Sequence, residues 1–263
     1  MPERDVYKHG VPSWIDLSTT DLEGAKAFYG ALFGWEADDV PTDQGMPYTM
    51  FRKNGRSVAG GGPMPPDMVE HGVPSMWNSY VNVDSVDDTL AEVESAGGSV
   101  MVPAMDVMSE GRMAFIVDPG GAAIGLWEPR NHKGAQLVNE HGTLTWNELM
   151  TDDLETAKAF YAAAFGWAAQ TDQMPDGTYY TTFKVGDDMA AGMMAKTPEM
   201  GPMPNYWGIY FAVDDCEAAV AKAAELGGTV VAPPFDTPIG KMAVLADPQG
   251  ATFALVSWSV PTE

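Results

Sequence analysis

Two acidic residues occupy equivalent places in the two halves of the chain. Asp16 lies two residues after Trp14, and Glu148 lies two residues after Trp146, so both pairs repeat at an offset of 132 residues (148 − 16 = 146 − 14). A carboxylate in an apolar setting has a raised pKa, and it can act as a general acid or base. It can equally recognise a ligand, or hold a structural hydrogen bond to a neighbouring strand or tyrosine. All three roles are open for Asp16 and Glu148.

The same offset extends well beyond these two acids. Residues 22–29 and 34–35 spell Leu-Glu-Gly-Ala-Lys-Ala-Phe-Tyr and Gly-Trp, and they return with one change at residues 154–161 and 166–167. Self-similarity at a fixed spacing indicates a repeated structural module. The chain therefore divides into two halves of about 130 residues each, a common domain size.

Each half divides once more. An alternating segment at residues 77–84 predicts a half-buried strand, and a helix-period stretch at residues 86–96 follows it and stops at Gly97. Asp-Pro turns at residues 118–121 and 247–250 each join two predicted strands. The predicted unit is a strand, a helix and about three strands, written four times and beginning near residues 10, 74, 142 and 204.

Composition narrows the class of partner. The chain of 263 residues carries a formal net charge of −23, which argues against nucleic acid and anionic membranes, because both require basic patches. It contains neither an apolar run of about 20 residues nor a signal-like start. We expect a cytoplasmic protein whose partner is a small neutral or cationic organic molecule. Its one cysteine, Cys216, excludes an internal disulfide and is expected to be a packing residue.

The four units resemble the vicinal oxygen chelate superfamily, which includes glyoxalase I, extradiol dioxygenases, and fosfomycin-resistance and bleomycin-binding proteins. The resemblance is carried by the Phe-Tyr helices, the Gly-Gly stops and the Asp-Pro turns, and it covers residues 10–258. Residues 14–21 and 146–149 are similar to tandem actinobacterial members described as glyoxalase-like or hydroxylase-like.

The resemblance implies an α+β fold with four βαβββ motifs in two tandem glyoxalase/bleomycin-resistance-like modules, with cup-shaped mixed sheets and helices outside. The first module would span residues 1–129, with motifs at about 10–64 and 74–129. A linker at 130–140 would lead to the second module at 141–263, with motifs at about 141–196 and 204–259. Which motifs pair to complete each cup stays open.

The resemblance also implies where a divalent metal ion would be bound. Such an ion needs imidazole, carboxylate or other oxygen ligands. The corresponding positions hold no such side chain apart from one asparagine: Trp14, Trp146, Asn78, Gly208, Gly125 and Ala254. We therefore expect neither a metal nor a cofactor.

Strand alternation predicts which side chains would line the cups. If Trp14 points inward, Asp16 does too, while Ile15 and Leu17 face the helices. The inward residues predicted to bind ligand are Trp14, Asn78, Tyr80 and Trp127 in the first half and Trp146, Tyr210 and Trp258 in the second. Apolar walls with a few polar groups are typical of sites for organic molecules, and aromatic rings favour planar or cationic ones.

Two function classes follow. The first is a metal-independent protein that binds a small hydrophobic, planar or cationic molecule, as in sequestration or resistance. The alternative is a glyoxalase-like lyase or a hydroxylase that uses Asp16 or Glu148 as acid–base, so whether the protein is an enzyme stays open. A monomer or a homodimer is permitted. His9, His71 and His141 are expected to share a structural role at the starts of motifs, and His132 in the linker is expected to be exposed.

Overall fold

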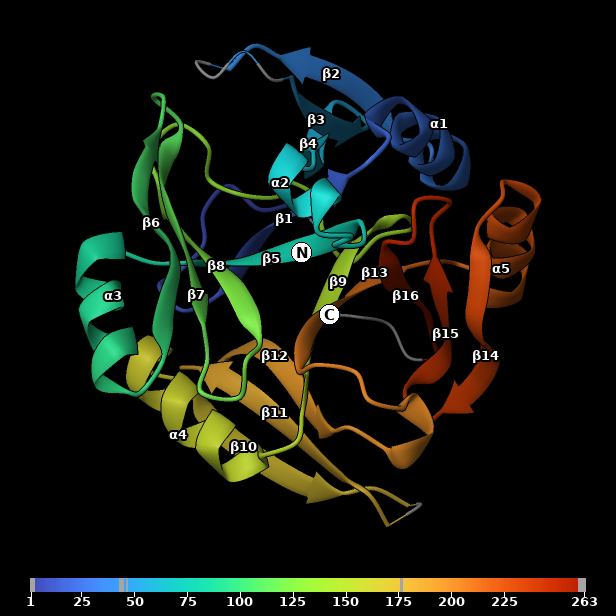
Figure 1. The fold of residues 1–263 in the computed structure, drawn as a ribbon. Helices are drawn as coiled ribbons and strands as arrows, with labels where there is room; N and C mark the ends of the chain where they lie inside the picture. The colour runs from blue at the N-terminus through green and yellow to red at the C-terminus, as the bar shows by residue number, and fades with distance from the viewer. Residues whose placement is uncertain (1–2, 43–44, 46, 176, 260–263) are drawn as a thin grey trace.

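The strand–helix–three-strand unit occurs four times in the computed structural model, which describes residues 3–42, 45, 47–175 and 177–259 (Figure 1). The first half runs in the order β1 (Pro12–Thr19), α1 (Leu22–Phe33), β2 (Glu36–Val40), β3 (Tyr48–Lys53), β4 (Arg56–Pro63), α2 (Pro66–Glu70), β5 (Met76–Asn82), α3 (Val86–Ser95), β6 (Ser99–Val107), β7 (Gly111–Val117) and β8 (Ala123–Pro129).

The second half repeats this order, with a short 3-10 helix in place of α2. Its elements are β9 (Thr143–Thr151), α4 (Leu154–Phe165), β10 (Ala168–Gln173), β11 (Tyr179–Val185), β12 (Asp188–Ala195), η1 (Pro198–Met200), β13 (Tyr206–Ala212), α5 (Cys216–Glu225), β14 (Thr229–Thr237), β15 (Gly240–Ala246) and β16 (Thr252–Trp258). None of the helices in the described part of the chain is long and apolar enough to cross a membrane.

The repeated sequence around residues 22–35 encodes the two ends of a helix. The Asp21 side chain accepts a hydrogen bond from the backbone N–H of Gly24 and so caps the start of α1, and Gly34 ends the helix with a φ of 71°. That left-handed conformation favours glycine. Asp153 and Gly166 cap α4 in the same way.

Each half of the chain forms one mixed eight-stranded sheet. The first module has the strand order β2-β3-β4-β1-β5-β8-β7-β6, and the second has β10-β11-β12-β9-β13-β16-β15-β14. Both sheets are open, since each order runs from one edge strand to the other. The two units of a module join through an antiparallel pair, β1 with β5 and β9 with β13. The motifs thus pair within each half, which resolves the alternative that the sequence leaves open.

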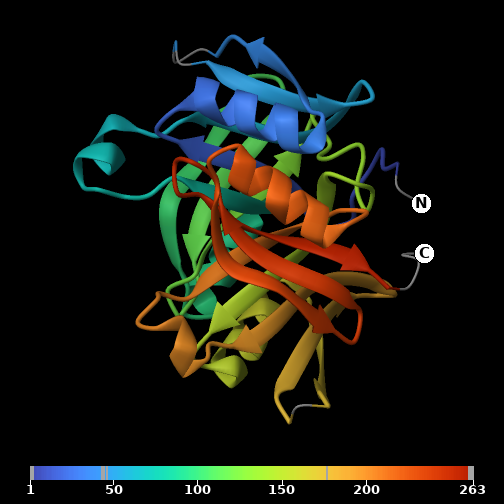
Figure 2. The same ribbon diagram turned by 90° about the vertical axis from the view of Figure 1, so that its right-hand side faces the viewer.

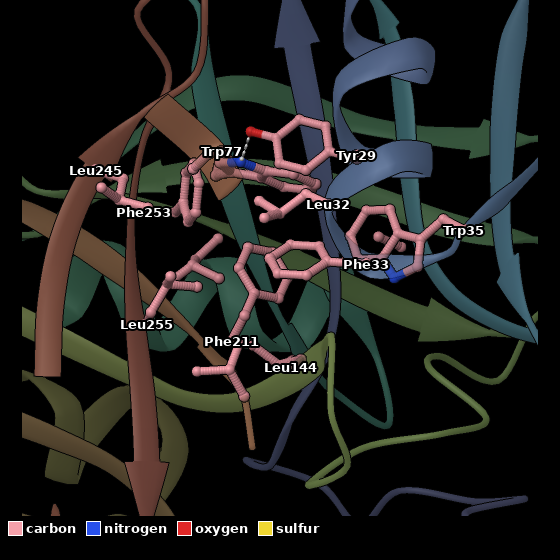
Figure 3. Close-up of a cluster of buried hydrophobic side chains, with 14 of the residues drawn as sticks. Tyr29, Leu32, Phe33, Trp35, Trp77, Leu144, Phe211, Leu245, Phe253 and Leu255 are labelled. Atoms are coloured by element: carbon pink, nitrogen blue, oxygen red, sulfur yellow. Dashed lines mark hydrogen bonds between the residues drawn. The ribbon is translucent and has the colours of Figure 1, made fainter. Parts of the chain in front are cut away.

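The helices cover one face of each sheet and also hold the two modules together. Helix α1 contacts α5, and α3 contacts α4 (Figures 1 and 2). One buried cluster contains side chains from the first and fourth units, and another contains side chains from the second and third. Figure 3 shows Tyr29 and Phe33 of α1 packed close to Phe211 and Phe253 of the other module. The core is therefore shared between the two modules.

A buried hydrogen-bond chain crosses each of these shared cores. The Trp77 indole N–H donates to the Tyr29 hydroxyl at 2.9 Å (Figure 3), and that hydroxyl donates to the Asp247 carboxylate of the other module at 3.0 Å. The second chain runs through equivalent residues: Trp207, Tyr161 and Asp118. The Asp-Pro turn therefore does more than join two strands, because its aspartate links the modules.

Candidate functional site

The face of each sheet that turns away from the helices carries the repeated Trp and acid, and we call it the inner face. Ile15 and Leu17 lie in the core under the helices, whereas Trp14 belongs to a separate cluster, so β1 alternates as predicted. Asp16 lies opposite Asn78 and Trp14 opposite Tyr80 in the β1–β5 pair. The strand register thus brings predicted site residues of the first module together at the centre of its sheet.

In the first module three side chains donate hydrogen bonds to Asp16. The Asn78 amide donates to Asp16 Oδ1 at 2.9 Å, and the Tyr80 hydroxyl donates to Oδ2 at 2.8 Å. Tyr48 of β3 also bonds to this carboxylate, and its hydroxyl accepts the Trp14 indole N–H at 3.1 Å. A chain of donors therefore runs from tryptophan through tyrosine to the acid.

The second module repeats this chain around Glu148. The Tyr210 hydroxyl donates to Glu148 Oε1 at 2.5 Å, and Tyr180 of β11 bonds to the same carboxylate. The Trp146 indole N–H donates to the Tyr180 hydroxyl at 2.8 Å. Gly208 lies opposite Glu148, so this module has no counterpart of the Asn78 amide.

Tyr48 and Tyr180 are site residues that the sequence reasoning missed. They are separated by the repeat offset (180 − 48 = 132), and an alignment of the two halves at that offset identifies them. Each needs a glycine beneath it, because a Cβ at Gly60 or Gly192 would overlap the tyrosine hydroxyl. The backbone of Gly60 thus lies directly against a side chain of the site.

Burial controls the electrostatics of both sites. It raises the pKa of Asp16, against the opposing effect of hydrogen bonds from Asn78, Tyr80 and Tyr48. It likewise raises the pKa of Glu148, against the opposing effect of Tyr210 and Tyr180. Both carboxyls therefore hold a proton more readily than exposed ones do.

The chain itself covers the tryptophan rings of the first inner face. Trp14, Tyr80 and Trp127 are 3%, 5% and 6% exposed, and they cluster with residues 135 and 138 of the segment that joins the modules. The His132 ring lies 4.3 Å from the Trp14 ring, measured between centroids, and 5.6 Å from the Trp127 ring.

The expectation that His132 is exposed is therefore wrong. Burial lowers the pKa of its imidazole to about 4. His132 is buried because two hydrogen bonds hold its segment in place. The N–H of Ala135 donates to the carbonyl of Ser13 at 2.8 Å, and the Trp127 indole N–H donates to the carbonyl of His132 at 2.9 Å. These bonds hold the connecting segment against the start of β1 and against β8.

The second inner face differs at several of these positions. Trp146 and Tyr210 are partly exposed, unlike their buried counterparts in the first module, and Val256 stands where Trp127 stands in the first. Trp258 follows Val256 by two residues on β16, which places both on one face. Its indole N–H is buried and has no hydrogen-bond partner among the described residues.

His9 and His141 have the structural role that the sequence predicts for them and for His71. The rings of His9 and His141 accept hydrogen bonds from the backbone N–H of Asp84 and Asp214, at 3.2 and 3.1 Å. His71 differs, because it follows the short helix α2 and its Nδ1 lies 2.6 Å from the backbone carbonyl oxygen of Asp67 in that helix.

The side chains around the two acids do not fit a divalent metal ion. Indole, phenol and amide groups present N–H and O–H donors to the carboxylates, whereas a cation needs several acceptors. Within residues 3–42, 45, 47–175 and 177–259, no three His, Cys, Asp or Glu side chains gather closely enough to hold a metal. We therefore derive no chemical step through such an ion.

Comparisons with known proteins agree with this architecture. Residues 12–126 and 143–255 match the model of the Glyoxalase/Bleomycin resistance protein/Dioxygenase superfamily. The chain is 49% identical to "Putative glyoxylase CFP32" of Mycobacterium tuberculosis, over 97% of this chain and 98% of that protein. It is 37% identical to "Anthracycline biosynthesis protein DauV" of Streptomyces sp. strain C5, over 95% and 94% of the two chains.

Solved structures show the same fold at low sequence identity. The Mn(II)-bound glyoxalase from Novosphingobium aromaticivorans superposes with a TM-score of 0.65 at 15% identity, over 97% of this chain and 86% of that one. The 2,3-dioxygenase LapB from Pseudomonas sp. KL28 gives 0.65 at 13% identity, over 98% and 96%. With four βαβββ units, two family matches and full-length relatives, this chain belongs to the glyoxalase, bleomycin-resistance and dioxygenase superfamily, the vicinal oxygen chelate fold.

Proposed function

We propose that the protein binds a planar, hydrophobic or cationic organic molecule on an inner face and holds it without chemical conversion. One observation carries the proposal: on each inner face a carboxylate is bonded by two tyrosines, one of which accepts a tryptophan indole N–H. Flat π-systems and cations interact favourably with such rings. Apolar walls with few polar groups are the usual composition of a site for organic ligands.

The hydrogen bonding of the acids favours recognition over catalysis. Asp16 accepts from three side chains and Glu148 from two, so much of their capacity as acceptors is already used. A general base must instead be free to reach the proton that it removes. The acid–tyrosine groups therefore suit a fixed polar contact better than a proton-transfer group.

The relatives support a flat aromatic ligand. One is named for anthracycline biosynthesis, and it matches this chain over almost its whole length. Anthracyclines are fused-ring aromatic molecules, which is the shape that tryptophan and tyrosine walls accept. A role in sequestering, protecting or delivering such a molecule is consistent with both the site and that relative.

A fluorescence titration tests the proposal. Addition of 2-aminoanthraquinone to the full chain should quench tryptophan emission saturably, because Trp146 lies beside the second acid. The anionic analogue anthraquinone-2-sulfonate is the control, and it should bind more weakly to a chain of net charge −23. Quenching that stays linear with concentration for both compounds would contradict a binding site.

A second candidate is an enzyme, a glyoxalase-like lyase or a hydroxylase that uses Asp16 or Glu148 as acid–base. The observation in its favour is the raised pKa of both carboxyls, which brings proton exchange closer to neutral pH. Turnover of a glutathione hemithioacetal, assayed with and without added Ni, Zn, Fe or Mn, tests the lyase. Turnover that is lost in Glu148→Gln would favour the enzyme over the binding protein.

A further inference from the structure

We propose that the ligand occupies the second module alone, with an N–H or O–H donor of a flat aromatic molecule placed on Glu148. That donor would take the position that the Asn78 amide fills beside Asp16 in the first module. The inference rests on the proposed function and specifies its site, its stoichiometry and one required chemical group of the ligand.

The two acids differ in how completely they are bonded. Asp16 has two tyrosine donors and the Asn78 amide, whereas Glu148 has two tyrosine donors and no amide. Gly208 stands at the register position of Asn78, directly opposite the acid. Glu148 is 5% exposed, and with two side-chain donors it accepts one hydrogen bond fewer than Asp16 does. A ligand donor would supply the third.

The position of the missing amide can accept a small side chain. A Cβ added at Gly208 would meet the Tyr206 ring at 3.5 Å, the Glu148 backbone oxygen at 3.6 Å and the Tyr210 ring at 3.8 Å, which are ordinary contacts. Its backbone is not in the left-handed region, so a side chain can be accommodated. A methyl group therefore fits beside the acid, next to the Tyr206 and Tyr210 rings.

In the first module the tryptophan rings are covered, whereas Asp16 is partly exposed. Trp14 and Trp127 are buried against the segment that joins the modules, and the His132 ring lies edge-on to the Trp14 ring. This segment therefore covers the rings that a flat ligand would contact. Trp146, by contrast, is partly exposed, and the large ring of Trp127 is replaced by Val256.

The second module also offers an N–H that has no partner. The Trp258 indole nitrogen is buried and unbonded among the described residues, and an unsatisfied buried donor is unfavourable. A ring carbonyl of a ligand can accept from it. The favoured ligand class is therefore a flat aromatic molecule that carries a carbonyl and an amino or hydroxyl group.

Calorimetric titration of the full chain with two matched probes tests the inference. 2-Aminoanthraquinone and 2-methylanthraquinone have similar size and both carry carbonyls, but only the first has a donor. We expect one molecule bound per chain and at least about tenfold tighter binding of the amino compound, the ratio expected for a hydrogen bond to a carboxylate.

Variants at Gly208 decide whether the donor lies where we place it. Gly208→Asn should weaken the amino probe at least about tenfold and remove its advantage over the methyl probe, because the new amide bonds Glu148 instead. Gly208→Ala, which adds bulk without a donor, should keep the advantage. Gly55→Asn on the exposed β3–β4 turn is the control for the added amide and should bind as the wild type does. Thermal melting of each variant verifies folding.

The outcomes separate this inference from the proposed function. Two bound molecules per chain, equal affinity for the two probes, or an amino preference that survives Gly208→Asn would overturn the inference and leave ligand binding intact. Failure of the wild type to bind either probe would overturn both proposals.

Discussion

Replacement of Tyr29 by phenylalanine should destabilise the whole protein, because the Tyr29 hydroxyl links the two modules. Tyr29 is fully buried, and its hydroxyl accepts from Trp77 at 2.9 Å and donates to Asp247 at 3.0 Å. The variant leaves a buried indole N–H and a carboxylate oxygen without this partner. Each unsatisfied buried group costs about 1–3 kcal/mol, so we expect a loss of about 2–4 kcal/mol in the free energy of unfolding.

Urea denaturation followed by tryptophan fluorescence measures this loss. Tyr161→Phe breaks the equivalent chain to Asp118 and should cost a similar amount, whereas Tyr179→Phe, on a side chain that is 54% exposed, should cost almost nothing. The reasoning would be refuted by a loss below about 0.5 kcal/mol for Tyr29→Phe at an unchanged denaturant dependence.

Three further predictions concern the inner faces. Burial raises the folded-state pKa values of Asp16 and Glu148, so their contribution to stability is present below about pH 4 and is lost as the pH rises through the folded-state values. Asp16→Asn/Glu148→Gln should therefore lose less unfolding free energy than the wild type between about pH 4 and 7 in urea titrations, and an identical loss in the two proteins would contradict this. Burial lowers the pKa of His132 to about 4, so NMR should show a neutral imidazole at pH 5. The free energy of unfolding should also fall as the pH drops from about 6.5 towards 4, because the unfolded chain binds this proton first. A ring that titrates near about 6.5 would refute its burial. Gly192→Ala should displace the Tyr180 hydroxyl and cost about 1–3 kcal/mol in unfolding free energy, and an unchanged melting temperature would show that the hydroxyl has room to move.

Local patterns predicted the strands of the site and the direction of their side chains. Side chains on a strand point alternately to its two faces, so the sequence alone placed Trp14 and Asp16 on one face and the apolar Ile15 and Leu17 on the other. Strand, helix and turn patterns within each half predicted the four units, and Gly97 predicted the end of one helix. These features depend on neighbours that are close in sequence.

The missing parts of the prediction depend on distant neighbours. Tyr48 bonds Asp16 across two strand pairings, and no pattern around Tyr48 marks that contact. His132 lies in a segment between the modules that has no periodicity, and its burial follows from backbone bonds to β1. The Tyr29–Asp247 bond joins the first unit to the fourth, and no local pattern distinguishes that partner from the other Asp-Pro turn.

The central claim is that a flat aromatic ligand binds on the inner face of the second module. The chain has eight tryptophans, and 19F NMR of the 5-fluorotryptophan-labelled protein, assigned by single Trp→Phe variants, can report on each of them. Addition of 2-aminoanthraquinone should shift the signals of Trp146 and Trp258 and leave Trp14 and Trp127 unchanged. Shifts at Trp14 and Trp127, or no shift at Trp146 at saturating probe, would contradict the account.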